Sequence, residues 1–329
     1  SLLLHIGCVC LVWKLISSLL RVHGGVSEKQ ILYVNFITTL LFAVHPINVE
    51  AVAWISALKV LLYAFFYLLG LLCYLRYIRT SKIFYYVLTI GCFLCSFWGK
   101  EQAVTFPLAL LIVDWFTNRN MKNLEVWSEK MSFLIMAFFF GIITVLSQGK
   151  GPYEMIFPLY QRLLFGCFAL VEYITKSLLP VNLNFFYPLA IVLGEEPPLH
   201  YYLYPVVLLF LMGWIIAYRN NRYLVFGVLL FLVNLLFSIH LFNMSRHAIV
   251  ADRYMYLSYV GIAFLIANGI WWLRKRLSYF KAALVFLFFY CFFLSVYTFH
   301  YTKKRENTTM VKKYTKEVLE KRLNGSNHL

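Results

Sequence analysis

The sequence predicts an all-α polytopic membrane protein, with about ten transmembrane helices and one further helix that is interfacial or re-entrant. Its 329 residues are 62% hydrophobic and only 13% charged, whereas soluble domains are roughly half apolar and about a quarter charged. The mean hydropathy is +0.73. One buried core cannot absorb this much apolar surface, but a bilayer can, because each spanning helix needs about 20 mostly apolar residues.

Ten apolar runs predict the transmembrane helices. They lie at about residues 2–20, 31–46, 58–76, 83–99, 103–117, 132–148, 201–218, 223–242, 256–273 and 282–300. An eleventh apolar run, at 160–178, carries Arg162, Glu172 and Lys176. Each of these charges would cost about 2.5–3.5 kcal/mol at the bilayer centre. We therefore expect the 160–178 helix to lie at the interface or to re-enter.

The basic residues are distributed unevenly between the two sides of the membrane. One set of alternate loops holds fourteen Lys and Arg residues and three acids, while the opposite loops hold seven of each, the tail excluded. The positive-inside rule places the first set in the cytoplasm. The assignment requires that 160–178 does not cross, and it puts both ends of the chain on the non-cytoplasmic side.

The net charge of +16 does not indicate a nucleic-acid partner, because it comes mostly from these short loops. The seven cysteines lie in apolar stretches, as buried thiols do, and do not form a disulfide framework. The sequence has no P-loop, no glycine-rich dinucleotide motif and no metal-ligand cluster. No residue is assigned to a metal, and a sugar donor for this protein is expected to be lipid-linked rather than a nucleotide sugar.

Polar residues gather in the loops of the non-cytoplasmic side. In the first such segment Pro46 interrupts an apolar run beside His45, Asn48 and Glu50. A broken helix leaves backbone groups free, which is tolerated only beside protein or water. The segment is either a capped helix end or part of a site. In the second segment, Lys100 and Glu101 either form an exposed pair in a turn, or Lys100 is a point charge that binds a lipid-linked phosphate.

A third outer segment, at 149–200, is rich in aromatic residues and proline. It either roofs a groove for a sugar or an acceptor, or anchors the chain at the headgroups. A fourth segment precedes the run at 256–273 and contains Arg246, Asp252 and Arg253. Arginine suits bidentate contacts to phosphate, but an ion pair with Asp252 that fixes the loop would use the same residues.

These outer segments also resemble a known family. The sequences HPINVEAVAWIS, KEQAVTFPLALLIVDW, KSLLPVNLNFFYP and ADRYMYLSYVGI are similar to the membrane domain of bacterial tetratricopeptide-repeat membrane proteins and of the eukaryotic TMTC O-mannosyltransferases. The resemblance runs in order over about residues 1–300. It implies a GT-C glycosyltransferase fold, a polyprenyl-phosphate sugar donor and an active site that faces the periplasm or the endoplasmic reticulum lumen.

The resemblance also implies a domain organisation. Residues 1–300 would be a GT-C-like transmembrane domain that lacks its first span and first outer loop, where such enzymes carry the catalytic carboxylate. Residues 301–329 would be a polar tail on the non-cytoplasmic side that leads to tetratricopeptide repeats. After Trp54, bacterial relatives often carry charges where this chain has Ala57, Leu58 and Val60, which weakens any role of that segment as a charged site.

The function expected from these observations is transfer of a sugar from a polyprenyl-phosphate donor to a protein or glycan acceptor. The alternatives are a transporter or assembly scaffold without enzymatic activity, and a lipid-linked glycan polymerase or ligase. The bacterial inner membrane is favoured over the endoplasmic reticulum. The candidate residues are Glu50, Glu101 and Asp252 for catalysis, Lys100, Arg246 and Arg253 for the donor phosphate, and His45, Asn48, His247 and Tyr254 in secondary roles.

Overall fold

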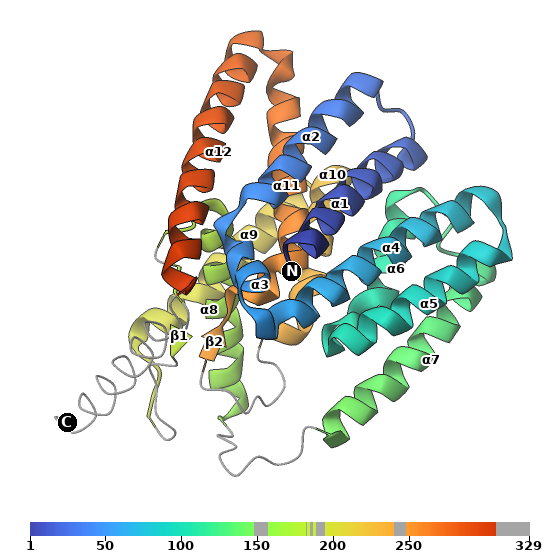
Figure 1. The fold of residues 1–329 in the computed structure, drawn as a ribbon, viewed down its shortest axis with the longest axis horizontal. Helices are drawn as coiled ribbons and strands as arrows, with labels where there is room; N and C mark the ends of the chain where they lie inside the picture. Colours follow the sequence, from blue (N-terminus) through green and yellow to red (C-terminus); the bar gives the residue numbers. More distant parts are fainter. Residues whose placement is uncertain (148–156, 182, 185–186, 189–194, 240–247, 307–329) are drawn as a thin grey trace.

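The chain folds as a bundle of helices (Figure 1). The computed structural model describes residues 1–147, 157–181, 183–184, 187–188, 195–239 and 248–306. The α-helices in this part of the chain are α1 (Leu2–His23), α2 (Glu28–Val44), α3 (Val49–Ala53), α4 (Leu58–Thr80), α5 (Ile83–Gly99), α6 (Phe106–Phe116), α7 (Leu124–Ser147), α8 (Leu159–Leu178), α9 (Leu203–Ala217), α10 (Arg222–Leu235), α11 (Met255–Trp272) and α12 (Leu277–Glu306).

Short elements connect these helices. The 3₁₀ turns are η1 (Pro46–Asn48), η2 (Ile55–Ala57), η3 (Glu101–Thr105), η4 (Leu199–Tyr202), η5 (Leu236–Ser238), η6 (Asp252–Tyr254) and η7 (Leu273–Lys275). Two short strands, β1 (Tyr187–Pro188) and β2 (Ala248–Val250), pair antiparallel. The predicted all-α class is confirmed, and this small ribbon is an addition to it.

The prediction of ten transmembrane helices is not supported. Each predicted run contains a helix, but among the described residues six helices are long and apolar enough to cross a bilayer, or seven if the bent pair α2 and α3 is one span. The difference lies in length: α5 has 17 residues and α6 has 11, against the about 20 that a bilayer core requires. The chain is a multi-pass membrane protein with fewer full-length spans than its apolar runs predict.

The eleventh run also forms a helix, α8, which is not among the six. Figure 1 shows α8 beside the β1–β2 ribbon at the end of the bundle where α3 also lies. Its position relative to the membrane surface stays a prediction.

Close backbone contacts fix the positions of two helix pairs. A Cβ atom at Gly261 of α11 would lie 2.5 Å from the carbonyl oxygen of Gly227 in α10, so the two backbones touch. A Cβ atom at Gly99, the last residue of α5, would lie 2.7 Å from the backbone nitrogen of Tyr63 in α4. Small residues allow this approach between membrane helices, and the second contact determines where Lys100 begins the next turn.

Side chains satisfy the backbone at the break that Pro46 creates. The chain bends by 50° between α2 and the η1–α3 segment. The backbone N–H of Ile47 donates to His45 Nδ1 at 3.2 Å, and Asn48 Nδ2 donates to the carbonyl oxygen of Phe42 at 2.7 Å. Backbone groups that a break in a membrane helix leaves free need local hydrogen-bond partners. His45 and Asn48 therefore stabilise this turn, after which α3 packs against η6.

Candidate functional site

An ion pair joins two outer turns that are far apart in the sequence. The guanidinium of Arg253, in η6, lies 2.7 Å from Glu50 Oε1, and the backbone N–H of Arg253 donates to Glu50 Oε2 at 2.8 Å. Both oxygens of the Glu50 carboxylate are therefore engaged by the same residue. Charge-assisted bonds of this kind are the strong ones, so Glu50 fixes both the backbone and the side chain of Arg253.

Aromatic rings flank the guanidinium of Arg253. Its Cζ atom lies 5.5 Å from the ring centroid of Trp54 and 5.1 Å from that of Tyr254, within the range of cation–π contacts. The Arg253 side chain is 17% exposed and Trp54 is 45% exposed. The guanidinium is therefore oriented by fixed groups while part of it remains accessible from outside.

Lys100 also contacts the Tyr254 ring. Its Nζ atom is 4.4 Å from the ring centroid, and the residue is only 5% exposed. Within the described part of the chain this buried ammonium has no hydrogen-bond partner. Burial lowers the pKa of Lys100 to about 7; Glu101 and Glu50 oppose the shift, whereas Arg253 and Lys59 add to it.

A second polar cluster lies next to Arg253, and its charged side chains contact one another. Tyr187, in β1, donates its hydroxyl to both carboxylate oxygens of Asp252, at 3.0 and 3.1 Å. The Lys176 ammonium lies 3.4 Å from the Tyr187 ring centroid and 3.3 Å from Glu172 Oε2. Asp252 is fully buried. These contacts attach η6 to the ribbon and to α8, and they keep Asp252 away from solvent.

The structure brings four of the predicted site residues into one cluster, which we call the outer site: Glu50, Lys100, Arg253 and Tyr254. The remaining described candidates have other positions. Asp252 is buried against Tyr187, His45 and Asn48 support the Pro46 break, and Glu101 is exposed at the start of η3. Arg246 and His247 lie outside the described residues.

Three residues of this region were not singled out as site residues in the sequence. They are Trp54, Lys176 and Tyr187. All three lie within the outer segments that the sequence marked as polar. The sequence did not identify the individual residues, because their roles depend on contacts with η6 or its partners, which are distant in the sequence.

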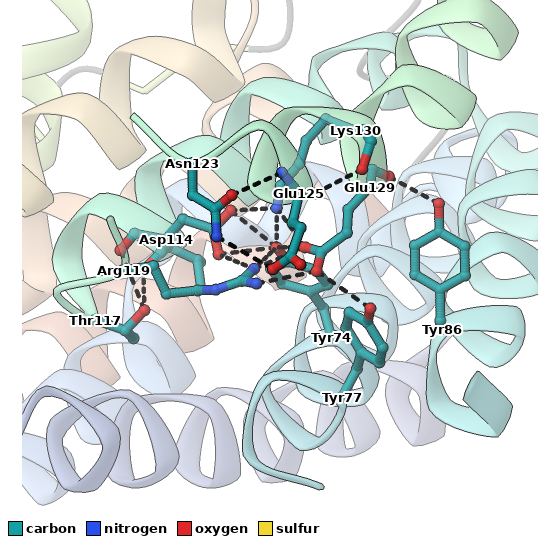
Figure 2. Close-up of polar contacts among 12 residues, drawn as sticks. Tyr74, Tyr77, Tyr86, Asp114, Thr117, Arg119, Asn123, Glu125, Glu129 and Lys130 are labelled. Atoms are coloured by element: carbon teal, nitrogen blue, oxygen red, sulfur yellow. Dashed lines mark hydrogen bonds and ion pairs between the residues drawn. The ribbon is translucent and has the colours of Figure 1, made fainter. Parts of the chain in front are cut away.

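The opposite end of α4 and α6 carries a larger ionic group, the inner network (Figure 2). Arg119 forms two bonds to Glu129, of 2.7 and 2.9 Å, and one of 3.1 Å to Asp114. Lys130 contacts Asp114 and lies 2.9 Å from Glu129. Tyr74 donates to Asp114 at 2.8 Å. Two acids and two bases balance here, which is typical of a structural clamp.

No three His, Cys, Asp or Glu side chains converge on a possible metal position in the described residues. The outer site consists of two cationic side chains, one carboxylate and the Tyr254 ring, with Trp54 beside Arg253. Cationic side chains are the groups that proteins use to bind phosphate.

Comparison with known proteins finds relatives that are named as protein O-mannosyl-transferases. Over 101 residues the chain is 36% identical to protein O-mannosyl-transferase TMTC2 of Mus musculus and 37% identical to TMTC2 of Homo sapiens, in each case 29% of this chain and 12% of the relative. It is 27% identical to Tmtc3 of Drosophila melanogaster over 145 residues, which is 38% of this chain and 16% of the relative.

These matches span less than a fifth of each relative's length. No protein-family model and no solved structure matches the chain. The resemblance predicted from the four motifs is confirmed for the eukaryotic family: in sequence, this chain resembles the TMTC protein O-mannosyl-transferases.

Proposed function

We propose that this chain is the membrane domain of a GT-C-class glycosyltransferase that takes a sugar from a polyprenyl-phosphate donor and gives it to a protein or glycan acceptor. One observation carries the proposal: Arg253, oriented by Glu50, lies beside a buried Lys100 that has no acceptor among the described residues. The relatives named as O-mannosyl-transferases support the class of reaction.

The charges of the outer site favour an anionic ligand. Both oxygens of Glu50 bind Arg253, and the Lys100 ammonium has no hydrogen-bond acceptor in the described structure. Burying an unpaired ammonium is unfavourable, so an arriving phosphate would relieve this. Arg253 would supply directed hydrogen bonds and Lys100 a point charge.

In the proposed reaction, the acceptor hydroxyl displaces the lipid phosphate at the anomeric carbon. The new bond joins this carbon to the acceptor oxygen, and the bond to the phosphate oxygen breaks with its electron pair. Arg253 and Lys100 offset the charge on the leaving phosphate. The hydroxyl proton goes to a carboxylate. Glu50 and Asp252 are engaged by Arg253 and Tyr187, so the base is Glu101 or, as the family resemblance implies, a carboxylate in a preceding outer loop.

The proposal also assigns the outer site to one side of the membrane. We place the site and the tail on the non-cytoplasmic side, because the loops at the opposite end carry the excess of basic residues. Tetratricopeptide repeats after the tail and a bacterial inner-membrane host, rather than the endoplasmic reticulum, belong to the same proposal.

The test is transfer of radiolabelled mannose from polyprenyl phosphoryl-mannose to acceptor protein, in membranes that contain the full-length protein. Arg253→Ala should abolish transfer and leave expression intact. Arg276→Ala, at an exposed arginine of the opposite loops, is the matched control and should transfer normally. Normal turnover by Arg253→Ala would overturn the phosphate role, and long lipid-linked oligosaccharide products would favour a polymerase or ligase.

A further inference from the structure

The position of Lys100 is fixed by backbone packing. Gly99 lies against the backbone of Tyr63, and the N–H of Lys100 donates to the carbonyl oxygen of Ser96 at 3.1 Å. The side chain then runs to the face of Tyr254 and stays 5% exposed. Lys100 is therefore the buried cation of the outer site, whereas Arg253 is partly exposed.

The charges around Lys100 come from four elements. Glu101 follows it in η3, Lys59 belongs to α4, Glu50 to α3 and Arg253 to η6. Glu101 and Glu50 favour a positive charge on Lys100, whereas Arg253 and Lys59 oppose it. With burial as the largest influence, the pKa of Lys100 falls to about 7.

We propose that the outer site binds its anionic ligand together with one proton, and that Lys100 holds this proton. The identity of the ligand, an isoprenyl phosphodiester of a sugar, rests on the function proposed above. An anion held by Arg253 supplies the hydrogen-bond acceptor that the Lys100 ammonium lacks in the described structure. The Lys100 amine then takes a proton from water, and no bond within the ligand changes.

The pH dependence follows from linkage between proton and ligand binding. The ligand raises the pKa of Lys100 above its ligand-free value of about 7. Below that value Lys100 is charged in both states, so affinity does not vary with pH. Above it, binding requires proton uptake, and affinity falls by up to about tenfold per pH unit. The site is thus expected to bind its anion more tightly below about pH 7 than at alkaline pH.

The experiment is titration calorimetry on the full-length protein in nanodiscs with citronellyl phosphoryl-mannose, a phosphodiester whose single charge is constant over this pH range. Measurements in two buffers of different ionisation enthalpy count the protons taken up. At about pH 8 we expect close to one proton and at about pH 6 close to none, since the ligand-free pKa of Lys100 is about 7.

Variants of two lysines test the assignment. Lys100→Arg keeps a fixed positive charge and should bind the probe without proton uptake and with affinity independent of pH. Lys100→Met should bind more weakly and also without uptake. Lys59→Met removes an exposed lysine nearby and should retain the uptake. Flat affinity in the wild type, or uptake that persists in Lys100→Arg, would overturn the proposal.

Inorganic sulfate, which does not titrate in this range, separates the two proposals. If sulfate binds with proton uptake that is lost in Lys100→Arg while the sugar phosphodiester does not bind, the proton-linked anion site stands and the proposed function fails. If neither probe binds at any pH, both are wrong.

Discussion

The inner network and the outer site are built from the same kinds of side chain, yet they differ in how those side chains are paired. At the inner end, Lys130 is fully buried and its ammonium reaches both Asp114 and Glu129. At the outer end, Lys100 is nearly as buried, and its ammonium lies over the face of Tyr254 with no hydrogen-bond acceptor in the described structure. A buried charge that is fully paired holds helices together. A buried ammonium without a hydrogen-bond acceptor is the observation on which the proposed anion site rests.

The two regions also differ in what they connect. The inner network joins the inner ends of α4, α6 and α7 (Figure 2), each of which belongs to the first half of the chain. The ion pair between Glu50 and Arg253 joins turns that are 203 residues apart. The outer site therefore exists only when the whole bundle has assembled, while the inner network requires only its first half.

The largest effect is expected from breaking the inner network. Lys130→Met leaves the fully buried Asp114 carboxylate with one partner fewer, and loss of one member of a buried ion pair costs about 3–5 kcal/mol. The melting temperature of the purified protein in nanodiscs should fall markedly. The double variant Lys130→Met/Asp114→Asn, which removes both charges, should recover much of the loss. A single variant with the wild-type melting temperature would contradict the comparison.

A smaller loss of stability, but a loss of function, is expected from Glu50→Gln. The change keeps the shape of the side chain but removes the charge that holds Arg253. Hydrogen bonds to charged groups contribute about 1.5–3 kcal/mol, which corresponds to about tenfold or more in transfer.

The kinetic constants show where the Glu50→Gln effect arises. We expect the KM for the lipid-linked donor to rise more than kcat falls, because Glu50 acts through Arg253. An effect on melting temperature as large as that of Lys130→Met, with donor KM unchanged, would make Glu50–Arg253 a structural pair like the inner ones.

The smallest effect is expected at the exposed pair between Arg21 and Glu28. The two side chains are 56% and 77% exposed and lie 3.2 Å apart. Surface pairs contribute about 0–1 kcal/mol, so Glu28→Gln should leave the melting temperature and sugar transfer nearly unchanged. A large loss of stability would show that burial is not what separates the strong ion pairs of this protein from the weak one.

Local sequence patterns predicted the helices well, but not how many of them cross the membrane. Apolar runs marked the helices, and Pro46 marked the 50° bend after α2. Runs such as 103–117 read as one span, whereas the structure divides that run between η3 and the 11-residue α6. Hydropathy depends only on the composition of a segment, so it does not reveal a turn that divides an apolar run into shorter elements.

The sequence located the polar outer segments but not the state of each residue within them. Glu50 and Asp252 looked like equivalent carboxylates, and the structure gives each a different fixed partner, Arg253 and Tyr187. The inner network was not predicted at all. Asp114, Arg119 and Lys130 read as separate charges near helix ends, and their pairing depends on how α4, α6 and α7 cross. Contacts of that kind have no local pattern.

The contact between Gly227 and Gly261 has a mechanical consequence. Because the backbones of α10 and α11 touch there, a side chain added at this point would force the two helices apart. Arg253 lies in η6, immediately before α11, so its position depends on that of α11. A larger side chain at Gly261 would shift Arg253 relative to Glu50, so the outer site could be altered by a substitution within the helix pair.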